Sequence, residues 1–287
     1  MAQKESKHSQ ERSEAYQSHL INILSDSNLP IGGFVSSSGL ESYLAHSFIT
    51  TDSERTKELT EFARLNVVNY ASLSIPFMNG VFTAIEYSDA EAVVESVMKL
   101  DRLYHAMCLN TVTRRSSLAQ GAAMVMLYTK SFSSADQTVM DVLKTRVRAS
   151  KRNLHFPIAY ALTSGLLGLS CARSIDLHLF LYIRSILSAA VRLNLIGPYL
   201  SQRILFSDIR PMLDDVMANL KNRRLSKSDQ IRCGLMIVEK NSSKDDDCAQ
   251  VDEDDSDDED VGATTTWPLG DILSARHDLC HVRLFNS

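Results

Sequence analysis

The feature that most constrains the fold of this 287-residue chain is a segment, Pro157–Leu169, that is apolar on nearly every face. A helix of this length is too short to cross the hydrocarbon core of a bilayer, which needs roughly 20 residues. Gly165 and Gly168 would let neighbouring helices approach it closely. The segment therefore predicts a central helix that other helices bury on all sides.

The sequence around this segment is helical in pattern from about residue 16 to residue 224. Apolar side chains recur there at the three- and four-residue spacing of an amphipathic helix, and no alternating pattern of a half-buried strand interrupts them. The fold class predicted is all-α, a single irregular helical bundle with a buried central helix. Pro76 is expected to bend or end its helix. Helices are predicted over 53–76, 89–104, 113–130, 136–147, 175–195 and 198–220.

The two ends of the chain differ from this region in composition. Residues 1–14 are polar and of mixed charge, and we expect a disordered N-terminal extension before an all-α domain at 15–224. Residues 225–266 are expected to be a flexible segment, because the acidic insertion at 244–260 has a charge density that cannot be buried. Residues 267–287 form a short tail with a more ordered pattern, to which we assign partner binding.

Charge and cysteine content indicate a cytoplasmic protein. The net charge of −5 arises from the insertion, so the remainder of the chain is mildly basic. The five cysteines are an odd number without a C-x-x-C pair, which favours a reducing compartment. No apolar run approaches the length of a membrane span, and the N-terminus lacks the apolar core of a secretory signal. We expect neither a membrane nor a nucleic-acid partner.

An apolar loop lies between the first two helical patterns. Residues 25–28 break the first helix, and Gly32-Gly33 provides a hinge that can adopt positive φ. Ser36 or Ser37 is predicted to cap the next helix. Large apolar groups on such a connection indicate either a packed corner or a partner surface. The loop contains Leu29, Pro30, Ile31, Gly32, Gly33 and Phe34, and it is followed by Gly39, Leu40 and Glu41.

This string resembles the N-terminal signature of the UreF family of urease accessory proteins, and three further segments resemble that family in the same order. Residues 113–121 are similar to its Arg-x-x-Ser-x-x-x-Gly helix, and residues 188–197 to its Ser-Ala-Ala-Val-Arg-Leu stretch and following glycine. The tail is similar to its Arg-His-Glu and Arg-Leu-Phe ending. The residues concerned are Arg114, Ser117, Arg192, Arg276, His277, Arg283, Leu284 and Phe285.

The resemblance implies a protein that performs no chemistry itself. It would bind the accessory protein UreH, also called UreD, and the GTPase UreG, and with them load nickel into apo-urease. It also implies a homodimer without a stably bound cofactor, in which nickel transits the complex and GTP belongs to the partner. The residues of the four segments are then expected to contact partners. The acidic insertion is absent from compact bacterial members, which indicates a eukaryotic, fungal-type member.

A metal site in the tail is a second interpretation. His277, Cys280 and His281 form an H-x-x-C-H cluster, and on a helix the two histidines would share one face, as imidazole ligands require. Cys280 and His281 depart from the family pattern, however. We therefore favour a tail whose polar side chains bind a partner over a tail that holds nickel.

Other functions have less support in the sequence. No G-x-x-x-x-G-K-[ST] loop or G-x-S-x-G elbow is present, so the chain is expected to be neither the GTPase nor an α/β-hydrolase. Terpenoid synthases bind Mg²⁺-diphosphate through aspartate clusters, but that chemistry needs two ordered clusters that face one cavity. A generic α-helical adaptor unrelated to urease stays as the alternative function, and partner capture with and without the tail would distinguish it.

Overall fold

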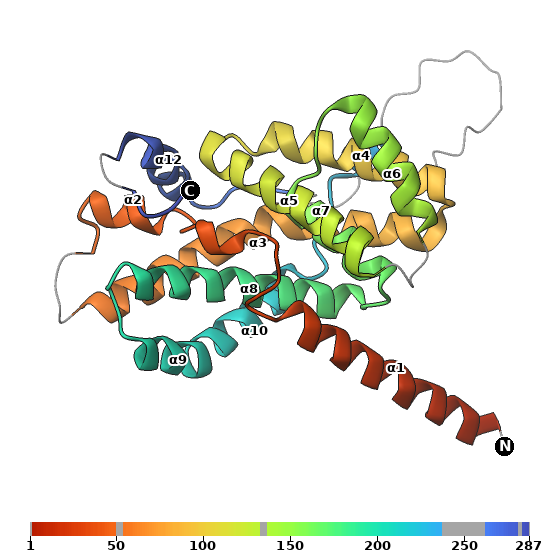
Figure 1. Cartoon of the computed structure of the whole chain (residues 1–287), viewed down its shortest axis with the longest axis horizontal. Coiled ribbons are helices and arrows are strands. Elements are labelled where there is room, and N and C mark those ends of the chain that lie inside the picture. Colours follow the sequence, from red (N-terminus) through yellow and green to blue (C-terminus); the bar gives the residue numbers. More distant parts are fainter. Residues whose placement is uncertain (1, 50–53, 133–136, 237–261, 281–282, 287) are drawn as a thin grey trace, which may run out of the picture.

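A computed structural model describes residues 2–49, 54–132, 137–236, 262–280 and 283–286 of the chain, and of residues 2–12 and 87 it describes the backbone alone. The described residues form helices, turns and loops and no β-strand, which confirms the predicted all-α class (Figure 1). The predicted disorder of 244–260 and the position of His281 lie outside the described residues.

Most helices follow one another with short connections, whereas 34 residues separate α11 from α12. Their bounds are α1 (Ala2–Leu24), η1 (Gly33–Val35), α2 (Leu40–Ala45), α3 (Arg55–Tyr87), α4 (Ala90–Met107), α5 (Thr111–Ser131), α6 (Thr138–Ser150), α7 (Phe156–Leu166), α8 (Cys171–Arg192), α9 (Pro198–Ser207), α10 (Ile209–Leu220), α11 (Lys227–Cys233), α12 (Pro268–Ala275) and η2 (Arg276–Leu279).

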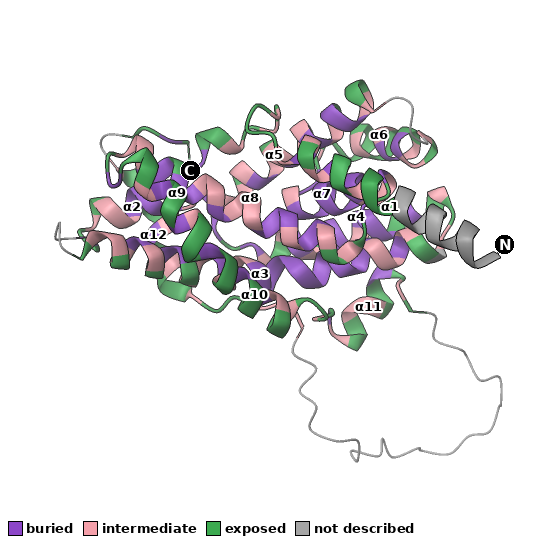
Figure 2. Cartoon of the chain, turned by 90° about the horizontal axis from the view of Figure 1, so that it is seen from below, coloured by how far each residue is buried: buried purple, intermediate pink, exposed green. Residues whose placement is uncertain are grey.

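The apolar segment forms the predicted central helix. In α7 every side chain from Pro157 to Ser164 is buried, and α3, α4, α5 and α8 surround it (Figure 2). Gly165 permits the expected close approach, since a Cβ atom there would lie 2.8 Å from Cδ1 of Ile85 on α3. Burial of this helix on all sides supplies the centre of the apolar core.

Pro76 neither ends α3 nor leaves its backbone unsatisfied. A proline inside a helix cannot donate to the carbonyl four residues earlier, here that of Ser72. The backbone N–H of Thr264 donates to this carbonyl at 3.2 Å. The chain that returns from the C-terminal side thus replaces the missing hydrogen bond, and α3 continues to Tyr87.

Three element boundaries differ from the sequence expectation. The helix predicted over 198–220 is divided at Asp208, because α9 packs on α8 whereas α10 turns to pack on both α3 and α8. Helix α1 begins at Ala2, within the expected extension. Leu225 and Cys233 are buried against the bundle, so ordered structure continues past residue 224 into the segment expected to be flexible.

Among the described helices, α8 alone is long and apolar enough by length and composition to cross a membrane, contrary to the sequence expectation. More than half of its most apolar stretch is buried inside the bundle, where it packs against α3, α7, α9 and α10. Such burial is typical of a core helix of the bundle. Helix α8 also forms one wall of the candidate site.

The candidate site lies at the end of the bundle where the first and last parts of the chain meet. Helix α12 and the C-terminus lie beside α2, while the N-terminal part of α1 projects from the opposite end (Figure 1). Helix α8 contacts both α2 and η1 at this end. The fold thus brings three of the four sequence motifs to one place.

Candidate partner-binding site

The apolar loop packs one side inward and leaves the other exposed. Leu29 and Ile31 pack partly buried against the core, whereas the Phe34 side chain is 69% exposed. Asp26 fixes the preceding turn, because its carboxylate accepts a hydrogen bond from the Asn28 N–H at 2.8 Å. The loop is therefore both a packed corner and a source of exposed apolar surface, so the two sequence interpretations hold together.

Only one glycine of the pair needs a left-handed backbone. Gly32 has φ +73°, whereas Gly33 does not have a positive φ, and a Cβ atom there would meet only Oε1 of Gln120 at 3.8 Å. We expect Gly32→Ala to lower the free energy of unfolding by about 1–2 kcal/mol, and Gly33→Ala to leave it nearly unchanged. Urea denaturation of the two variants measures this difference, and equal losses in both would contradict it.

Helix α2 begins after Gly39 rather than at the predicted serine caps. Gly39 has φ +84°, and a Cβ atom there would lie 3.0 Å from Cβ of Ser274 on α12. Ser37 still contributes, since its hydroxyl accepts from the Glu41 N–H at 3.4 Å. The glycine of this motif therefore allows both the turn and the close approach of the C-terminal tail.

The carboxylate of Glu41 holds the tail. It accepts hydrogen bonds from the backbone N–H groups of Leu284 at 2.5 Å and Phe285 at 3.1 Å, and Nε2 of His277 lies 2.9 Å from it. Glu41 and His277 are both buried. Hydrogen bonds to a buried carboxylate are stronger than neutral ones and costly to leave unmade. Glu41 thus connects the N-terminal motif with the chain end.

The tail is docked on the bundle by hydrogen bonds to α2 and to η1 at the end of the apolar loop. The Ser42 hydroxyl donates to the Leu273 carbonyl at 2.5 Å, and the Asn286 N–H donates to the Val35 carbonyl at 2.9 Å. Phe285 is buried, whereas Leu284 is 61% exposed. Of the apolar pair at the chain end, Leu284 alone offers a surface to a partner.

Arg192 joins a third motif to the other two. Its guanidinium carbon lies 3.9 Å from the ring centroid of Phe34 and 4.3 Å from that of Phe285. Nη1 also donates to the Phe34 carbonyl at 2.6 Å. A guanidinium against aromatic rings gains a cation–π interaction. Arg192 therefore holds the loop and the tail together at the C-terminal end of α8.

The three residues of the fourth motif that match the family pattern, on α5, bond or pack inside the bundle. Arg114 donates from Nε and Nη2 to the Cys108 carbonyl, at 3.0 and 2.6 Å. The Ser117 hydroxyl accepts from the Phe156 N–H at 3.0 Å, at the start of α7. A Cβ atom at Gly121 would lie only 2.0 Å from the Leu154 carbonyl oxygen. Arg114 thus fastens α5 to the end of α4, and Ser117 and Gly121 fasten it to the start of the central helix.

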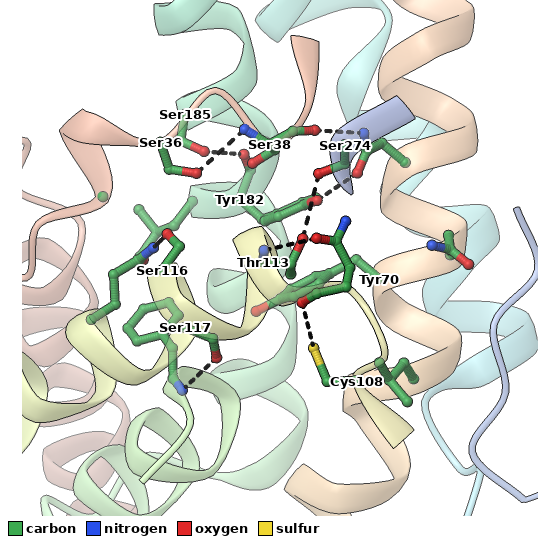
Figure 3. Close-up of a pocket in the computed structure, with 18 of the residues that line it drawn as sticks. Ser36, Ser38, Tyr70, Cys108, Thr113, Ser116, Ser117, Tyr182, Ser185 and Ser274 are labelled. Atoms are coloured by element: carbon green, nitrogen blue, oxygen red, sulfur yellow. Dashed lines mark hydrogen bonds between the residues drawn. The ribbon is translucent and has the colours of Figure 1, made fainter. Parts of the chain in front are cut away.

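A cavity of about 750 Å³ opens between the loop, α3, α5, α8 and α12. Figure 3 shows hydroxyl groups from all of these elements at its walls, among them Ser38, Tyr70, Thr113, Tyr182 and Ser274. Burial raises the pKa of Tyr70 and of Tyr182, and it raises the pKa of the lining Cys108 thiol to about 11, so these groups are neutral at pH 7. The exposed side chains of Phe34, Leu109 and Ile272 lie among the lining residues.

The family model described as UreF matches residues 54–207, more than half of the chain. The chain belongs to the UreF family. It is 33% identical to urease accessory protein 6 of Cryptococcus neoformans var. grubii, over 95% of this chain and 98% of that protein. Urease accessory protein F of Oryza sativa subsp. indica is 31% identical, over 72% of this chain and 74% of that protein. Urease accessory protein UreF of Bacillus sp. (strain TB-90) is 26% identical, over 92% of this chain and 96% of that protein.

Membership in the UreF family confirms the resemblance, and the structure adds a residue that the motifs did not identify. Arg115, the neighbour of Arg114, forms an ion pair with Asp278 at 3.0 Å and donates to the Asn286 carbonyl at 3.2 Å. Asp278 also pairs with Arg283. The sequence feature that could have indicated Arg115 is the pair of consecutive arginines, because the family pattern matches only Arg114.

His277 does not lie on the α-helix that the metal interpretation assumed. Helix α12 ends at Ala275, and residues 276–279 form the short 3₁₀ helix η2, so the four-residue spacing of an α-helix does not apply. Nε2 of His277 is engaged by Glu41, and the Cys280 thiol donates to the Arg276 carbonyl at 3.9 Å. Within the ranges that the structure describes, no three His, Cys, Asp or Glu residues are grouped as a metal site requires.

Proposed function

We propose that this UreF-family protein is a non-catalytic cytoplasmic accessory factor that bridges a UreH/UreD-type protein and a UreG-type GTPase, so that nickel is loaded into apo-urease. Nickel is cargo in this scheme and GTP belongs to the partner. The protein acts as a homodimer, and its own contribution is a surface that orders the other components.

The observation that carries the proposal is the junction of loop, α8 and tail around Glu41 and Arg192. A buried carboxylate with three donors and a guanidinium between two aromatic rings give this surface a defined shape. Beside it, Leu109 is 81% exposed, Phe34 69% and Ile272 59%. Grouped apolar side chains that stay exposed on an ordered surface are typical of protein interfaces.

Co-expression with urease and its accessory proteins tests the proposal. We expect urease from cells with the wild-type chain to contain nickel and hydrolyse urea, and urease from cells without it to contain little nickel. Phe34→Asp combined with Leu109→Asp should reduce the nickel content at least about tenfold, since two charges would be desolvated in the interface. Met126→Asp, at a 55% exposed site on α5 outside the cavity lining, is the matched control.

Two results would contradict this function. Full nickel loading without the chain would make it dispensable for urease maturation. Stable capture of unrelated proteins, with no UreH/UreD-type protein among them, would favour the alternative of a generic helical adaptor.

A further inference from the structure

One ionisable group in the cavity lacks a partner of opposite charge. Asp271, in the first turn of α12, is half-buried and lines the cavity. Its carboxylate accepts one long hydrogen bond, from Nδ2 of Asn69 at 3.4 Å, and no Lys or Arg of the described residues forms an ion pair with it. Burial of this carboxylate raises its pKa. The α12 dipole favours a negative charge there but does not neutralise it.

The charged residues that share the cavity lining are already engaged. Arg184 and Arg192 donate to backbone carbonyls, those of Ser25 and Phe34, rather than to Asp271. Asp26, the other acidic lining residue, is exposed and bonds to Asn28. Burial lowers the pKa of Arg184, and the charge of Asp26 opposes this shift. The cavity wall is mostly apolar, with two basic and two acidic side chains among its lining residues. Of these four, Asp271 is a half-buried carboxylate that neither arginine contacts.

We propose that this cavity receives a lysine or arginine side chain of the partner protein, whose positive charge meets Asp271. The inference rests on the proposed function, because the occupant is a residue of the UreH/UreD-type protein that binds the same surface.

The shape and chemistry of the cavity fit such an occupant. The exposed Phe34, Leu109 and Ile272 can pack against the apolar stem of a long basic side chain, while its charged group lies deeper. Oxygen acceptors are available there, since the hydroxyls of Thr113 and Ser274 lie 3.5 Å apart on the same lining. A guanidinium offers five donors and an ammonium three, so several neutral oxygens and one carboxylate match their needs.

A bare divalent cation fits less well. Calcium takes six to eight oxygen ligands and zinc takes four, usually with several anionic or imidazole donors. The cavity supplies a single half-buried carboxylate, and Cys108 is held as a neutral thiol. Its volume of about 750 Å³ is also much larger than a single ion occupies.

The test compares Asp271→Asn with wild type in binding the UreH/UreD-type protein, by calorimetry at low and high salt. Asparagine keeps the size and can keep the contact with Asn69, so we expect the fold and melting temperature to be retained. Affinity should fall roughly tenfold to hundredfold, and the salt dependence of the dissociation constant should become shallower. Asp215→Asn, an exposed position on α10 outside the cavity lining, should change neither quantity.

The outcomes separate this inference from the function on which it rests. If wild type binds the partner and Asp271→Asn binds with the same affinity and salt dependence, the inference is wrong and the function stands. If wild type does not bind, the bridging function falls, and the inference falls with it. If Ni²⁺ or Mg²⁺ alone raises the melting temperature of wild type but not of Asp271→Asn, the cavity is a cation site and the side-chain occupant is wrong.

Discussion

Replacing Glu41 by glutamine should release the C-terminal tail from the bundle while the helical body stays folded. The two carboxylate oxygens of Glu41 accept hydrogen bonds from His277, Leu284 and Phe285. Glutamine has only one acceptor oxygen and cannot accept all three. The amide –NH₂ would face these donors. Because hydrogen bonds to a charged group contribute about 1.5–3 kcal/mol each, we expect the tail to lose about 2–4 kcal/mol of local stability.

Hydrogen exchange read by mass spectrometry measures this effect directly. Amides of residues 268–280 and 283–286 should exchange faster in Glu41→Gln, by roughly 30-fold or more for that loss of stability. The exchange rates of the α7 amides should be the same in the variant and in wild type. Glu86→Gln, at an exposed position near the end of α3, is the matched control. Wild-type protection of the tail in Glu41→Gln would mean that Arg192 and the contacts of Asp278 suffice to hold it.

The same variant bears on urease maturation. If the proposed function is right, a released tail removes the ordered surface that partners bind, and urease activation should fall with the loss of tail protection. Activation at the wild-type level with a fully exchanging tail would show that partners order the tail themselves. The docked tail of the isolated chain would then have no part in recognition.

The secondary structure could be predicted wherever local sequence determines it. The segment Pro157–Leu169 is apolar all round, and only a buried helix accommodates that pattern, so α7 was identified correctly. The break at Asp208 was missed because both halves of 198–220 favour helix. The division is decided by packing, since α10 reaches α3 as well as α8. The continuity of α3 through Pro76 depends on Thr264, which is far away in the sequence.

The candidate site could be predicted only in part for a related reason. A recurring motif identifies residues that matter without saying whether they face a partner or the interior. Glu41 and His277 were expected to meet partners, yet they meet each other across 236 positions of sequence. Ser117 was expected at an interface, and it accepts from the start of α7 instead. Long-range pairs of this kind carry no local signal, so the docking of the tail required the structure.

Acid should destabilise the protein sharply below pH 6.5, through two buried histidines. His155 and His178 are almost fully buried, and burial lowers the pKa of each to about 3. For His155 the nearby His105, Arg152 and Arg114 contribute to this lowering of the pKa, after burial. Nδ1 of His155 lies 3.1 Å from the Ser117 hydroxyl and its Nε2 3.0 Å from Nδ1 of His105, while His178 contacts the Tyr70 hydroxyl at 2.8 Å.

The sign of the pH dependence follows from where protons bind. In the unfolded chain these histidines take up protons near pH 6.5, whereas in the folded chain they stay neutral until about pH 3. Stability is therefore fully present above pH 6.5 and is lost as the pH falls. Each histidine costs up to about 1.4 kcal/mol per pH unit, so the pair should lower the free energy of unfolding by about 3 kcal/mol between pH 6.5 and 5. Asp101 acts in the opposite direction, because burial raises its pKa.

Urea denaturation at pH 7, 6 and 5 measures the slope, and His178→Phe provides the internal comparison. Phenylalanine fits the aromatic surroundings of Phe156 and Tyr160 and cannot be protonated. The variant loses the hydrogen bond to Tyr70 and should be less stable at pH 7. Its loss of stability between pH 6.5 and 5 should nevertheless be about half that of wild type, because one of the two titrating groups is gone. An unchanged slope would mean that His178 is not held neutral in the fold.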